Sequence, residues 1–94
     1  MNIENKKTEL PGPDDTTLDY AAILAIVVKP VPKGMDIEEM TKRADLLCKL
    51  QASGDTIELN EEDTVYLRSI WKGFSNWTEV NDDIVALGRE VAAK

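Results

Sequence analysis

Carboxylates are the most abundant groups in this chain that could do chemistry. Acidic side chains gather in three stretches, residues 36–39, 58–63 and 79–83. Paired carboxylates can transfer protons or bind Ca²⁺ or Mg²⁺. Most of these stretches lie where a helix is predicted to begin, and a negative charge there stabilises the helix by about 0.3–1 kcal/mol without any other role. We therefore interpret the acids as helix-capping and first-turn residues.

The other reactive residue types point away from an enzyme. Histidine is absent, which removes the commonest general base and the commonest zinc ligand. The single cysteine, Cys48, lies beside the apolar stripe of a predicted helix, and we predict a buried structural thiol there. The stretch from Asp55 to Asp63 lacks the alternating ligands and central glycine of a calcium loop. No phosphate-binding loop or dinucleotide fingerprint is present, so we predict no enzyme, no cofactor and no metal.

Four helices are predicted to make up most of the chain. The first runs through residues 18–28, is capped by Thr16 or Thr17, and must end at Pro30. It is apolar nearly all round, which is typical of a central core helix or of a helix in an interface. Because so small a domain has few elements to cover it, this helix is the main candidate for self-association.

The other three helices have clearer signals. Asp36 and Glu39 resemble a capping box at the start of the second helix, which should end near Ser53-Gly54. Asn60 and Asn81 are predicted caps of the third and fourth helices. The predicted core-facing residues of these three helices recur at three- and four-residue spacing. They are Ile37, Met40, Ala44, Leu46, Leu47 and Leu50, then Leu67, Ile70, Trp71 and Phe74, and finally Ile84, Leu87, Gly88 and Val91.

The predicted fold is therefore a compact, mainly α bundle of about four short helices. Residues 56–59 leave room for one short β segment, because Thr56 to Leu59 alternate in polarity. Residues 1–15 are polar and end in Pro11-Gly12-Pro13-Asp14-Asp15, so we predict a flexible arm ahead of a single helical domain over residues 16–94.

The charge of the chain limits its partners. Eighteen acids against 11 bases give a net charge of −7, which repels nucleic-acid phosphates and anionic membranes. No signal peptide is visible, and the longest apolar run, residues 20–28, is too short to span a bilayer. We expect a cytoplasmic protein that contacts neither membrane nor nucleic acid directly.

Aromatic residues mark the second candidate surface. Trp71, Phe74 and Trp77 are three of the five aromatic residues and fall within seven positions. Tryptophan fills cores and is also enriched at binding hot spots, so core packing and a partly exposed patch both stay open. The predicted interaction residues come from the first helix and from this tract. They are Tyr20, Ile23, Ile26, Val27, Trp71, Phe74 and Trp77.

A pattern across residues 19–91 resembles small uncharacterised proteins of tailed phages and prophages. Its elements are Asp19-Tyr20, the Pro30-x-Pro32-x-Gly34 connector, Ile37-Glu38-Glu39-Met40 with Arg43, Ile57-Glu58-Leu59 before an acidic helix, and Trp77 before the last helix. The resemblance supplies no catalytic residue. It implies an accessory or assembly protein in the cytoplasm of a host bacterium.

Three hypotheses follow for function. The first is a non-enzymatic interaction module that binds itself or another protein. The second is an acidic inhibitor of a host nucleic-acid-binding protein or defence system, which requires a contiguous acidic face. The third is an enzyme or a helix-turn-helix DNA binder, which the acid-rich helices and the long connection between the middle helices disfavour. We predict the interaction module.

Overall fold

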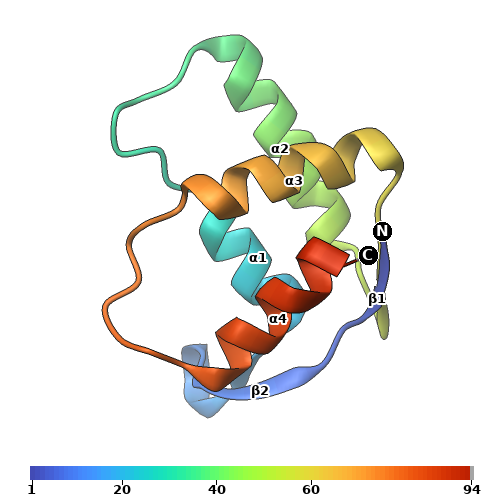
Figure 1. Cartoon of the computed structure of the whole chain (residues 1–94), viewed down its shortest axis with the longest axis vertical. Helices are drawn as coiled ribbons and strands as arrows, with labels where there is room; N and C mark the ends of the chain where they lie inside the picture. Colours follow the sequence, from blue (N-terminus) through green and yellow to red (C-terminus); the bar gives the residue numbers. More distant parts are fainter. Residues whose placement is uncertain (94) are drawn as a thin grey trace.

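The computed structural model describes residues 1–93, and within them the chain is mostly helical with a few short strands (Figure 1). The helices are α1 (Tyr20–Val28), α2 (Ile37–Gln51), α3 (Glu61–Gly73) and α4 (Asp82–Ala93). The strands are β1 (Asn2–Glu4), β2 (Lys7–Pro11), β3 (Thr17–Asp19) and β4 (Thr56–Glu58), with a short 3₁₀ turn η1 (Pro13–Asp15). The predicted four-helix, mainly α fold is confirmed in outline, whereas the sequence predicted only the strand at 56–59.

The helix α1 forms the centre of the molecule. Leu24, Val27 and Val28 are fully buried, and Figure 1 shows α1 behind α3 and α4. Because other elements cover this helix on most sides, nearly every one of its residues is apolar. The helix ends before Pro30, as predicted, but it begins later than expected. Asp19 caps it by accepting a 2.9 Å hydrogen bond from the backbone N–H of Ala22, because residues 17–19 are held in β3.

The first 15 residues are ordered, in contrast to the predicted flexible arm. Strand β1 pairs antiparallel with β4, and Ile3 lies opposite Ile57. Both side chains are buried in the core. The local sequence does not predict strand β1, because Ile3 is a single apolar residue among polar ones. The strand forms only because the distant β4 pairs with it. The prediction of an independent arm over residues 1–15 is therefore corrected.

A hairpin joins the arm to α1. Strands β2 and β3 pair antiparallel, and the buried Thr8 hydroxyl donates to the carbonyl oxygen of Leu18 at 2.7 Å. The turn between the strands passes through Asp14 and Asp15, which have left-handed φ values of 55° and 60°. Aspartate is one of the few non-glycine residues that tolerates this conformation, and two consecutive left-handed residues suit a tight hairpin turn.

The predicted caps of the other helices are present. Asp36 accepts from the backbone N–H of Glu39 at 2.8 Å, and Asn60 accepts from the backbone N–H of Asp63 at 2.8 Å. Asn81 accepts from the backbone N–H of Ile84 at 3.1 Å. Each bond satisfies an N–H that has no partner inside its own helix, so these three side chains fix where the helices begin.

The helix α2 uses a different face from the one predicted to meet the core. Leu46 and Leu50 are fully buried, but Ile37 is 75% exposed and Met40 is 49% exposed. Figure 1 shows the reason: the first turns of α2 project beyond α3, so only the second half of the helix lies against the body. The prediction that Ile37, Met40 and Ala44 face the core is therefore wrong.

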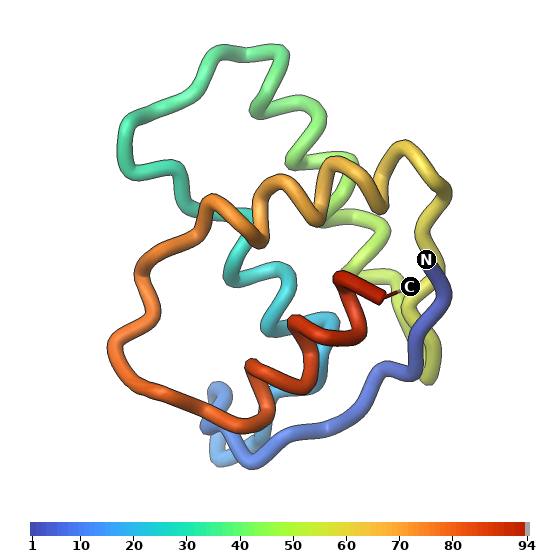
Figure 2. The backbone as a smooth tube through the Cα atoms, in the orientation of Figure 1, coloured from blue at the N-terminus to red at the C-terminus, as the bar shows by residue number. Residues whose placement is uncertain are grey.

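Long connections complete the chain. Residues 29–36 and 74–81 follow wide arcs that are visible in the tube view (Figure 2). Among residues 1–93, the longest apolar helix falls short of what crossing a bilayer requires.

Candidate interaction surface

The predicted self-association residues of α1 are mostly inside the protein's own core. Tyr20 is 4% exposed, Ile23 is 3% exposed and Val27 is fully buried. These three residues cannot contact a partner in the folded protein, which corrects that part of the prediction. Ile26 differs from them, because its side chain is 49% exposed on the outer side of α1.

The aromatic tract divides between core and surface. The ring centroids of Phe74 and Trp77 are 4.6 Å apart in an edge-on arrangement, and those of Trp71 and Trp77 are 5.6 Å apart. Trp71 lies against α4 at Gly88, where an added Cβ would be 3.2 Å from the indole ring. Trp71 and Phe74 are half-buried, whereas Trp77 is 38% exposed. The tract mainly joins α3 to α4, and Trp77 is its outermost member.

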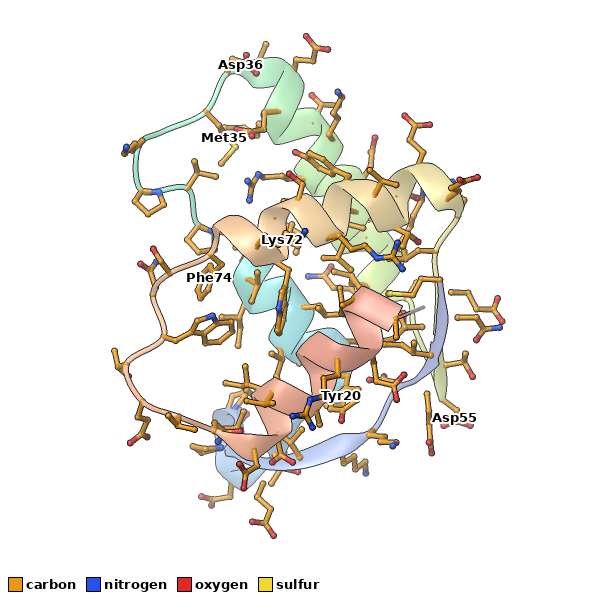
Figure 3. All side chains as sticks on the ribbon, viewed as in Figure 1. Tyr20, Met35, Asp36, Asp55, Lys72 and Phe74 are labelled. Carbon is orange, nitrogen blue, oxygen red and sulfur yellow. The ribbon has the colours of Figure 1, made fainter. Side chains whose placement is uncertain are left out.

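Phe74, labelled in Figure 3, follows the end of α3. It lines a small groove. Its volume is about 210 Å³, and Val27, Ile70 and the Pro30–Pro32 segment contribute apolar wall. Arg43 and Tyr66 also line it, and their Nε and hydroxyl atoms are buried without a hydrogen-bond partner among the described residues. Since neither atom is accessible to solvent, neither can reach a bound molecule without a side-chain rotation.

The clearest surface feature is on α2 and the neighbouring edge of α1. We call it the uncharged face. It is built from the outward residues of α2 together with one residue of α1. Its members are Ile26, Ile37, Met40, Thr41, Ala44, Leu47, Cys48 and Gln51. All are exposed except Leu47, which is half-buried at the edge of the core. Cys48 is therefore an exposed thiol, and the prediction that it is buried is wrong.

The position of Ile26 beside α2 follows from how the two helices run. The Arg43 Nη1 atom donates to the Val28 carbonyl oxygen at 2.7 Å, so the C-terminal end of α1 lies near the middle of α2. Ala22 and Ala25 border the same small hollow as Gln51 near the end of α2. The helices are thus antiparallel neighbours, and along their common axis Ile26 is at a level between these two points of contact.

Charged groups surround this face rather than occupy it. The acidic side chains of α2, α3 and α4 concentrate in the first turns, at 38–39, 61–63 and 82–83. Lys49 pairs with Asp63 across α2 and α3, and this hydrogen bond raises the pKa of the Lys49 ammonium. Lys49 is exposed to solvent, and such a pair contributes little stability. Within residues 1–93, no three potential metal ligands come together.

The sequence contained a signal for the uncharged face. Apolar residues of α2 fall on two adjoining stripes, one through Ile37, Met40 and Ala44, the other through Leu46 and Leu50. Together they cover more of the helix circumference than a single neighbouring layer can bury. Such a wide apolar surface is buried only where neighbours cover all of it, as they nearly do around α1 and do not around α2.

Comparison of the chain with protein-family models, curated proteins and solved structures finds no match. The resemblance to small proteins of tailed phages therefore stays a prediction. What the protein does has to be argued from its own surfaces.

Proposed function

We propose that this protein is a non-enzymatic interaction module that binds protein through its uncharged face. The observation that supports the proposal is the exposure of large apolar side chains on α2 and on the helix packed beside it, α1. Ile37 is 75% exposed, and Met40 and Ile26 are each 49% exposed. An accessory or assembly role in a phage, as the sequence resemblance implies, would be one setting for such a module.

The composition of the chain makes this exposure significant. Charged residues make up 31% of the chain. The eight residues of the uncharged face include no charged residue. Contiguous apolar patches on soluble proteins commonly mark binding sites. Covering apolar surface favours a complex, although the lost freedom of the two partners offsets part of the gain. A protein partner with an apolar surface of its own would gain most from this contact.

The single cysteine provides a native probe of the proposal. Cys48 is exposed on the uncharged face, so its rate of reaction with a maleimide reports whether the face is covered. We expect the rate to fall as the protein concentration rises, while light scattering shows a mass above 10.5 kDa. A constant rate together with a constant monomer mass would contradict self-association through this face.

Two matched variants distinguish the effect of a charge on the uncharged face from the effect of an added charge elsewhere on the surface. Ala44→Glu places a carboxylate at the centre of the face, whereas Ala86→Glu makes the same change at an exposed position of α4. We expect Ala44→Glu to weaken association by about tenfold or more, because the carboxylate would lose its water in the complex. Ala86→Glu should associate like the wild type. Equal association of both variants would show that α2 is not the contact surface.

A further inference from the structure

We draw no further inference here: the strongest candidate, the outward face of α2 with Ile37, Met40 and Cys48, belongs to the surface already described, and nothing in the structure shows what covers it.

Discussion

At the scale of single residues, four polar side chains determine where the helices begin. Each accepts a hydrogen bond from the backbone N–H three residues later, and they are Asp19, Asp36, Asn60 and Asn81. Around Asn60 the cap is reinforced by the acidic first turn of α3, Glu61 to Asp63. Most of the acids that first suggested a chemical site lie at helix starts, where the electrostatics of helix ends explains them.

The cap at Asn60 can be measured. We expect Asn60→Ala to lower the free energy of unfolding by about 1 kcal/mol, because the Asp63 N–H loses its acceptor. Asn60→Asp keeps an acceptor at the same position and should stay close to the wild type. Urea denaturation of the three proteins provides the comparison. Equal losses in both variants would show that the side-chain amide has a role other than capping.

At the scale of elements, the sequence predicts α1 as the helix that associates with a partner and α2 as a core helix. In the structure, α1 is the core helix and α2 carries the exposed apolar residues. The more apolar helix, α1, lies inside the molecule, and only Ile26 reaches far into solvent. The amphipathic helix α2 carries the exposed apolar strip. Its first turns project past α3, and further along the helix the strip is on the side away from the buried Leu46 and Leu50. The candidate surface for association therefore moves from the centre of α1 to α2 and the edge of α1.

Two glutamate substitutions in α1 distinguish core from surface. Ile23→Glu buries an unpaired carboxylate at a site that is 3% exposed, which should cost several kcal/mol and unfold most of the protein. Ile26→Glu changes a half-exposed side chain and should alter the free energy of unfolding by about 0.5 kcal/mol or less. Circular dichroism during thermal unfolding would show the difference, and light scattering should show weaker association for Ile26→Glu. Similar melting temperatures for the two variants would contradict the buried position of Ile23.

At the scale of the whole molecule, net charge and the uncharged face act in opposite directions. The charge of −7 on each copy opposes association, while burial of apolar side chains favours it. Salt strongly changes only the repulsion between charges. The distance over which exposed charges interact falls from about 30 Å at 0.01 M salt to about 10 Å at 0.1 M salt.

Self-association should therefore strengthen as salt is raised from about 0.01 M to about 0.15 M. Sedimentation equilibrium or light scattering at matched protein concentrations would measure the change. An acidic inhibitor that imitates nucleic acid should behave in the opposite way, because its attraction to a basic partner weakens with salt. Association that falls as salt rises would indicate that charge pairs, and not the uncharged face, hold the copies together.

Local features of the sequence determined the helices and their ends. The caps Asp36, Asn60 and Asn81 and the stop at Pro30 act over one or two turns, so their effects can be read without knowing the rest of the fold. The apolar character of α1 likewise predicted a core or interface helix. The two apolar stripes of α2 can also be read from the sequence. These features fixed the elements but not their surroundings.

Only the tertiary structure decided which apolar residues are covered. Ile3 became part of the core because β4, more than 50 residues away, pairs with β1. Cys48 and Met40 remained outside because α2 packs mainly on α1 and turns Leu46 and Leu50, not this strip, toward the core. Burial depends on neighbours that are distant in sequence, and helical periodicity shows that a face is apolar without showing what packs on it. For that reason the candidate interaction surface became visible only once the helices were placed against one another.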